Sequence, residues 1–154
     1  MEYIMELRKL VGHQPLIMVG ATMLLINQQQ ELLMIKRTDN LCWGVPGGSI
    51  ELGESLEECA SRETCEEVGI KVDQLKLFGI YSGEEMHYTY PNGDEVYMVS
   101  AVFLSKINHE CIQLNLDEHS AYRFFKLNEI PDEVSPPIKP ILRDLISTYK
   151  ESHA

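Results

Sequence analysis

Residues 48–70, GSIELGESLEECASRETCEEVGI, decide the fold of this chain. Within them, Ser55 and Glu58 form a capping box, in which each side chain binds the backbone amide of the other residue at a helix N-terminus. Gly69 supplies the left-handed backbone conformation on which many helices end. The stretch therefore predicts a helix over residues 55–68 whose two ends are both defined by the sequence.

One stripe of this helix changes along its length from apolar to acidic side chains. At about 100° per residue, the stripe begins with small or apolar residues and continues with three glutamates at i, i+3 and i+4 spacing. Its members are Leu56, Cys59, Ala60, Glu63, Glu66 and Glu67. Because the apolar part must face the core, we expect the three carboxylates to be carried toward the protein body as well.

Three inward carboxylates need positive charge close by. A partly buried glutamate costs several kcal/mol unless it is paired or neutralised. Arg62 is the one basic residue close to the triad in sequence, and one guanidinium does not balance three carboxylates. Hard divalent cations prefer compact sets of carboxylate oxygens, so the pattern indicates a site for Mg²⁺ or Mn²⁺. The alternative interpretation is a solvated acidic helix face, which is common in acidic proteins.

The sequence around this helix predicts a mixed α/β (α+β) fold. Runs of apolar and β-branched residues indicate strands, and two further segments have the pattern of helices. We expect helices at about 2–11 and 137–149, strands at 16–27, 31–37, 75–81, 86–90, 95–104 and 121–126, and a loop over 38–48. Asn92-Gly93 is a tight-hairpin signal between two of these strands. Hairpins with two or three helices imply a mixed sheet that is covered on both faces.

Charge narrows the possible partners. The chain has 154 residues, with 24 acidic against 13 basic side chains and a net charge of −11. Such a chain repels polyanions, so no nucleic-acid polymer is expected as a partner. A small phosphorylated ligand is compatible if metal ions neutralise the meeting of anions. No apolar run reaches the roughly 18–20 residues of a membrane helix, so no membrane partner is expected.

Two further features bear on the compartment. The N-terminal residues MEYIMELRKL contain acidic side chains and no apolar signal core, so we expect a cytoplasmic location. The cysteines, which include no CxxC pair, are Cys42, Cys59, Cys65 and Cys111. Free thiols in a reducing compartment are therefore expected in place of a structural zinc site.

The stretch 48–70 resembles the Nudix box, the signature of the Nudix (MutT-like) hydrolase family. Every glycine and polar position of the box is matched at the required spacing, and only Thr64 stands where Leu or Ala is more common. The matching residues are Gly48, Glu54, Arg62, Glu63, Glu66, Glu67, Gly69 and Ile70. Similarity extends to WGVPGG at 43–48 and RFFKLNEIP at 123–131. The resemblance implies a single Nudix domain over 1–154, folded as an α/β/α sandwich with a mixed sheet between helices.

The resemblance also implies roles for the box residues. In the family, the glutamates that match Glu63, Glu66 and Glu67 bind one to three divalent cations, with the carbonyl oxygen of the residue matching Gly48 as a further ligand. The cations neutralise charge on a diphosphate and activate a water for in-line attack on phosphorus. Arg62, counted here with the catalytic set, is expected to organise the loop and the helix through a salt bridge.

Other residues complete the expected site. Relatives often carry a glutamate where this chain has Ala121, and this departure makes Glu118 the loop candidate for the general base, with a box glutamate as the alternative. Arg37 is placed as phosphate-contacting arginines are in some relatives. Glu54 either joins a salt bridge that organises the loop or reaches the site, and we group it with Arg37 and Tyr88 as substrate-binding candidates.

The resemblance implies an enzyme that hydrolyses a diphosphate linkage in a small nucleotide-like substrate. We expect a nucleoside diphosphate joined to another moiety, such as ADP-ribose or a nucleotide sugar. Nucleoside triphosphates, oxidised ones included, and dinucleoside polyphosphates are alternatives within the same reaction class. A nucleotide-binding regulatory module without catalysis is an alternative of another class, although such relatives usually lose box carboxylates. We expect a monomer or a homodimer.

Overall fold

The computed structural model describes residues 2–108 and 111–152. Its helices are α1 (Glu2–Val11), α2 (Leu56–Val68) and α3 (Lys139–Ser152), with short 3₁₀ helices η1 (Glu84–Met86) and η2 (Pro136–Ile138). Its strands are β1 (Leu16–Ile26), β2 (Glu31–Arg37), β3 (Trp43–Gly44), β4 (Gly47–Ser49), β5 (Lys76–Tyr81), β6 (His87–Thr89), β7 (Glu95–Lys106) and β8 (His119–Lys126).

Strand β1 organises a mixed sheet, to which eight strands of the described part of the chain belong. It runs parallel to β7 over its whole length, from the Leu16–Val96 pair to the Ile26–Lys106 pair. The strand order is β3-β2-β1-β7-β5, and β4 pairs with β1, β6 with β7, and β8 with β2. All of these other pairs are antiparallel. The predicted mixed sheet is confirmed.

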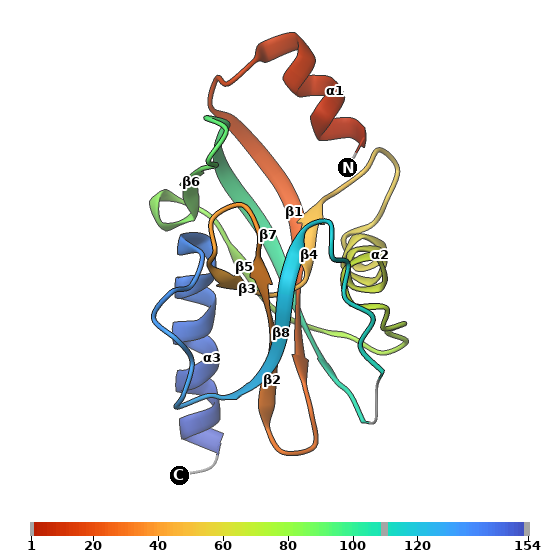
Figure 1. The fold of residues 1–154 in the computed structure, drawn as a ribbon, viewed down its shortest axis with the longest axis vertical. Coiled ribbons are helices and arrows are strands. Elements are labelled where there is room, and N and C mark those ends of the chain that lie inside the picture. Colours follow the sequence, from red (N-terminus) through yellow and green to blue (C-terminus); the bar gives the residue numbers. More distant parts are fainter. Residues whose placement is uncertain (1, 109–110, 153–154) are drawn as a thin grey trace.

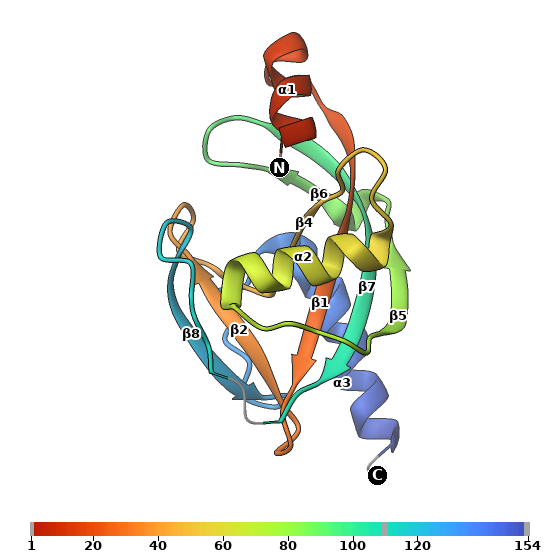
Figure 2. The same ribbon diagram turned by 90° about the vertical axis from the view of Figure 1, so that its right-hand side faces the viewer.

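Helices cover both faces of this sheet. Figure 1 shows α3 and α2 on opposite sides of the strands, and Figure 2 shows α2 in front of the strands and α3 behind them. Alternate residues of β1 and β2 enter two separate cores, because successive side chains of a strand point to opposite faces. Met23, Leu25, Leu33 and Ile35 pack on the side of α2 with Cys59 and Ala60. Leu24, Ile26, Leu32 and Met34 pack against Ile141 and Leu145 of α3.

The two strands β1 and β2 separate as they leave the hairpin that joins them. The Ile26–Leu32 pair is the register recorded between them, close to the turn. Farther along, β1 pairs instead with β4 and β2 with β3. The divergence leaves a cavity that is lined by parts of β1, β2, β3, β4 and β7, and this cavity is the candidate functional site.

The expectation of a loop over 38–48 was wrong in part, because β3 and β4 form within it. Strands of two or three residues are too short to show an alternating pattern, and tertiary partners fix them. Trp43 donates its backbone N–H to Glu133, and its carbonyl oxygen accepts from Ser135. Gly47 and Gly48 bring β4 against β1, where a Cβ at Gly47 would lie 2.6 Å from the carbonyl oxygen of Ala21.

The helices lie close to their expected positions, with one difference at the C-terminal end. Residues 136–138 form a 3₁₀ turn ahead of α3, which begins at Lys139. A proline at the second position of this helix is tolerated, because the first backbone amides of a helix have no partner within it. No helix among residues 2–108 and 111–152 is both long and apolar enough to cross a membrane.

We predict that Gly20→Ala destabilises the protein by about 1–3 kcal/mol, because the new methyl group would overlap the carbonyl oxygen of Gly48 on the neighbouring strand. The new methyl group would be attached directly to the backbone of β1 and the carbonyl belongs to the backbone of β4, so neither group can move aside at low cost. Urea unfolding followed by circular dichroism measures the change. Gly44→Ala is the matched control, since its nearest neighbour is the Ser135 hydroxyl at 4.0 Å. Equal stabilities of the two variants would refute this account of the β1–β4 contact.

Candidate metal and diphosphate site

Helix α2 has the two ends that the sequence predicts. The Ser55 hydroxyl accepts the backbone N–H of Glu58 at 3.0 Å, and the Glu58 carboxylate accepts that of Ser55 at 3.2 Å. Gly69 ends the helix with a φ of +74° and donates its N–H to the carbonyl oxygen of Cys65. These fixed ends set the rotation of the helix about its axis, and therefore which side chains face the sheet.

Two of the three glutamates of the stripe point inward, and one does not. The exposed fractions of Glu63 and Glu67 are 4% and 7%, whereas the side chain of Glu66 is 54% exposed. The prediction that Glu66 also points inward was wrong. At about 100° per residue, Glu66 lies roughly 60° to one side of Glu63 and Glu67 lies roughly 40° to the other, where the helix meets the body.

Arg62 binds the carboxylates on one side of the helix. Its guanidinium forms a two-bond pair with Glu54, with distances of 2.6 Å from Nε and 3.0 Å from Nη2. Its Nη1 lies 3.0 Å from Glu63 and 3.3 Å from the nearer oxygen of Glu66, and its Nη2 donates to the carbonyl oxygen of Ser49 at 3.2 Å. The Arg62 guanidinium thus joins the loop to the helix and contacts three carboxylates.

The inward glutamates lie against glycine backbone. The Gly47 N–H donates to Glu67 at 2.8 Å. A Cβ at Gly48 would overlap the carboxylate of Glu63, so any larger residue would displace that side chain. Gly48 pairs with Ala21 in the β1–β4 ladder, and its carbonyl oxygen also accepts a weak bond from the Cys59 thiol at 3.5 Å. The two inward glutamates thus meet the backbone of one short strand, β4.

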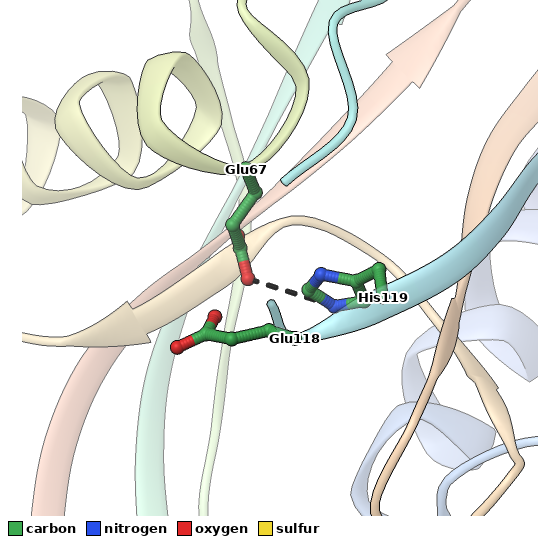
Figure 3. Close-up of side chains that lie close together, drawn as sticks. All are labelled: Glu67, Glu118 and His119. Atoms are coloured by element: carbon green, nitrogen blue, oxygen red, sulfur yellow. Dashed lines mark ion pairs between the residues drawn. The ribbon is translucent and has the colours of Figure 1, made fainter. Parts of the chain in front are cut away.

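Glu67 has neighbours from another part of the chain (Figure 3). Ligand atoms of Glu67, Glu118 and His119 all lie within 4.8 Å of one another, and His119 Nε2 is 3.9 Å from a Glu67 oxygen. The loop before β8 docks on the end of α2, where the N–H of Asn115 donates to the carbonyl oxygen of Glu67 at 2.8 Å. This contact carries the start of β8 to the acidic face of the helix.

Burial dominates the protonation of this cluster. It raises the pKa of Glu63 to about 7, against the opposing effect of the Arg62 charge and hydrogen bond. It raises the pKa of Glu67 well above the usual range, although the Gly47 N–H opposes this. Burial also lowers the pKa of His119 to about 4, and the nearby charge of Arg37 adds to the effect. At neutral pH the imidazole is therefore neutral and contributes no positive charge.

The donor set fits a divalent cation. Among the described residues, no lysine or arginine is recorded in contact with Glu67, and the guanidinium of Arg62 is divided among other carboxylates. Buried carboxylates without a compensating charge are costly. Glu67 and Glu118 share one group of close ligand atoms with His119, and this group does not include Glu63 or Glu66. Carboxylate oxygens are the ligands that Mg²⁺ and Mn²⁺ prefer.

A cavity connects this cluster with aromatic side chains. Its lining includes Glu67 and His119, and also Arg37, Tyr88 and Tyr90. The rings of Tyr88 and Tyr90 meet edge to face with centroids 4.8 Å apart. The space can therefore hold a molecule that places phosphate at the carboxylates and a flat group at the tyrosines.

The structure distributes the substrate-binding candidates over two places. Arg37 and Tyr88 line the cavity. Glu54 is not among the lining residues, and its carboxylate accepts from Arg62 and from the backbone N–H of Glu51. This is the salt-bridge position that the sequence left open as one of two alternatives.

Sequence reasoning assigned no role to His119. Its neighbours come from the end of α2 and from β2, where it pairs with Arg37 in the β-ladder. Strand β8 begins at His119, two residues before the predicted start at 121. A buried histidine beside two carboxylates is a property of this strand pairing, and no spacing in the sequence indicates it.

Comparison with known proteins identifies the family. A model of the NUDIX domain matches residues 16–145. An ADP-ribose pyrophosphatase from Methanocaldococcus jannaschii is 33% identical over 110 residues, which cover 70% of this chain and 61% of that protein. A putative 8-oxo-dGTP diphosphatase from Bacillus subtilis is 40% identical over 62 residues, which cover 40% of this chain and 42% of that protein. The chain thus spans about two to three fifths of these two relatives.

A solved structure is similar over more of the chain. The MutT NUDIX hydrolase from Burkholderia pseudomallei superposes with a TM-score of 0.69 at 26% identity. The match covers 84% of this chain and 97% of that one. The likeness therefore extends over most of this chain.

We predict that Glu63→Gln stabilises the metal-free protein, and that the gain grows as pH rises from about 5 to about 8. A folded-state pKa of about 7 lies above the ordinary glutamate value of 4.5. The stability that Glu63 contributes to the folded state is therefore fully present only below pH 4.5, its ordinary pKa. That stability is lost as the pH rises through the folded-state pKa of about 7. Glutamine keeps the neutral form at every pH.

Melting temperatures in EDTA, recorded as the difference between variant and wild type, measure this effect. Saturating Mg²⁺ or Mn²⁺ should raise the melting temperature of the wild type more than that of the variant, because cations bind only the folded cluster. Glu57→Gln, on the exposed side of α2, is the control. A gain that is the same at every pH would contradict the assignment.

Proposed function

Because this chain belongs to the NUDIX domain family, we propose that it hydrolyses the diphosphate linkage of a nucleoside diphosphate joined to another moiety, with Mg²⁺ or Mn²⁺ as cofactor. Members of the family generally use a divalent metal. The observation that carries the proposal is the burial of two glutamates of one helix, Glu63 and Glu67, of which Glu67 lines the cavity. We also propose that the protein is cytoplasmic and that residues 1–154 form a single domain.

The reaction is the addition of water to one phosphorus of the linkage. When bound, the cations would neutralise charge on the diphosphate and supply an activated water. The bond between the phosphorus and the bridging oxygen breaks, and that oxygen leaves with the electron pair as part of the second phosphate. The Gly47 N–H holds Glu67 in place through the bond at 2.8 Å, and Arg62 holds Glu63 and Glu54.

Glu118 is our candidate for the general base. Its side chain is exposed, in contrast to the buried Glu67 and His119 beside it. An exposed carboxylate can take a proton from the attacking water and release it to solvent. Glu63, a glutamate of the box, is the alternative.

The similarity to the Methanocaldococcus jannaschii ADP-ribose pyrophosphatase supports a substrate of the ADP-ribose or nucleotide-sugar type. The cavity supports it as well, because Tyr88 and Tyr90 offer an aromatic surface to a nucleobase. The printed name of the Bacillus subtilis relative favours a second candidate, an oxidised nucleoside triphosphate, although that match covers a shorter stretch of this chain. A purely regulatory nucleotide-binding module is less consistent with a chain that keeps every box carboxylate.

A panel of substrates tests the proposal. We expect Mg²⁺-dependent release of AMP from ADP-ribose or of a nucleoside monophosphate from a nucleotide sugar. Hydrolysis of 8-oxo-dGTP or of diadenosine tetraphosphate with greater efficiency would favour the alternatives within the reaction class. Chromatography of the products, with separate assays for phosphate and pyrophosphate, distinguishes them. Binding of nucleotides without turnover of any compound would support the regulatory module instead.

Substitutions on α2 test the carboxylates one at a time. Glu66→Gln and Glu67→Gln should each lower turnover by about 100-fold or more, since each removes an anionic oxygen from the proposed cation site. Glu57→Gln is the matched control, because Glu57 is exposed on the same helix and outside the cluster. Circular dichroism would verify that the variants fold. Near-normal turnover in either test variant would remove that residue from the proposed site.

A further inference from the structure

The cavity offers little positive charge to a polyphosphate. Among the described residues that line it, Arg37 is the single lysine or arginine. The other titratable groups of its lining include Glu67, which is acidic, and His119. A ligand with a long phosphate chain therefore has one basic side chain to meet, beyond any cations held by the carboxylates.

That one base is already paired. Asp39 accepts two hydrogen bonds from Arg37, at 2.8 Å from Nε and 2.7 Å from Nη2. This arrangement occupies two of the three nitrogens of the guanidinium, which also lies 5.9 Å from the centre of the Tyr90 ring. The pair raises the pKa of Arg37 and lowers that of Asp39, so both remain charged at neutral pH.

The loop after β2 holds Asp39 in this position. One carboxylate oxygen also accepts the backbone N–H of Asn40 at 2.8 Å. The amide of Asn40 in turn donates to the Tyr88 hydroxyl at 2.7 Å and accepts from the backbone N–H of Cys42. Neighbouring residues of one loop therefore neutralise the arginine of the cavity and orient its tyrosine.

We propose that Asp39 determines substrate choice by neutralising Arg37, so that the cavity favours ligands with a diphosphate over those with a longer phosphate chain. The inference rests on the proposed function and names the residue that selects among its substrates. Each added phosphate brings negative charge close to Asp39, Glu67 and Glu118, and Arg37 does not compensate for it while it is bound to Asp39. Repulsion of this kind acts as selection against the longer chain.

Asp39→Asn tests the proposal with little change of shape. The asparagine oxygen can still accept from Arg37 and from the Asn40 N–H, while the negative charge is lost. Titration calorimetry in Mg²⁺ would compare α,β-methylene-ADP with α,β-methylene-ATP, which share the base and the linkage and differ by one terminal phosphate. The substitution should raise the affinity for the triphosphate analogue about fivefold more than that for the diphosphate analogue. The difference should shrink at high salt.

Two further variants separate this effect from a general change of charge. Asp73→Asn makes the same change of net charge at an exposed residue that does not line the cavity, and it should leave the ratio of affinities unchanged. In the double variant Arg37→Gln/Asp39→Asn the preference gained from Asp39→Asn should be lost. An equal gain for both analogues, or the same gain from Asp73→Asn, would overturn the proposal.

The binding experiment can refute the role of Asp39 without refuting the proposed reaction, and the substrate panel can refute the reaction without refuting the role of Asp39. If the wild type hydrolyses nothing in the substrate panel, the proposed reaction is wrong, but the two analogues still measure what Asp39 selects. If the panel shows turnover and Asp39→Asn leaves the ratio of affinities unchanged, only the role of Asp39 is refuted. If neither analogue binds to the wild type or to the variants, the cavity is not a site for these nucleotides and the inference about Asp39 fails.

Discussion

The burial of two glutamates on the inner face of one helix is the constraint on which the rest of this structure depends. Glu63 and Glu67 face the body of the protein because Cys59 and Ala60, on the same stripe, belong to the core. Each buried carboxylate then needs a hydrogen-bond donor or a positive charge close by. Gly48 leaves room for Glu63, Gly47 donates its N–H to Glu67, and Arg62 ties the helix to the preceding loop. These contacts leave the cluster short of positive charge, which is the condition that a divalent cation relieves.

The sheet supplies the space beside that cluster. Strands β1 and β2 are joined near their hairpin and separate beyond it, so the short strands β3 and β4 and a cavity fit between them. Strand β8 pairs with the other edge of β2, from the Glu31–Lys126 pair as far as the His119–Arg37 pair. Groups from the helix, from β2 and from β8 therefore meet at one cavity, although they are up to 82 residues apart in sequence. Glu67 at one part of the wall and Tyr88 and Tyr90 at another make the cavity suited to a nucleotide-like ligand.

The carboxylates of this site and the residues that orient its arginine and tyrosine come from different kinds of element. The carboxylates come from one helix whose ends are fixed by local hydrogen bonds, so their positions follow from a rigid element. Asp39 and Asn40 come from a loop, and they act on the cavity through Arg37 and Tyr88. Loops vary more readily than helices without loss of the fold. If Asp39 selects among phosphate chains as we propose, a change in this loop would alter that selection and leave the carboxylates of the helix in place.

The sequence by itself determined α2, its capping box, its Gly69 end and the family of the chain, because those signals lie within a short stretch and depend on local hydrogen bonds and spacing. It also indicated the long strands, whose apolar runs reflect their burial. Only the tertiary structure decided that the Glu66 side chain is exposed, because the periodicity of a helix defines a face but not where its neighbours end. Strands β3 and β4, the cluster of Glu67, Glu118 and His119, and the Arg37–Asp39 pair beside the tyrosines all depend on contacts or placements that the chain order does not specify. The separation of β1 from β2 makes room for β3, β4 and the cavity, and no residue pattern in either strand reveals it.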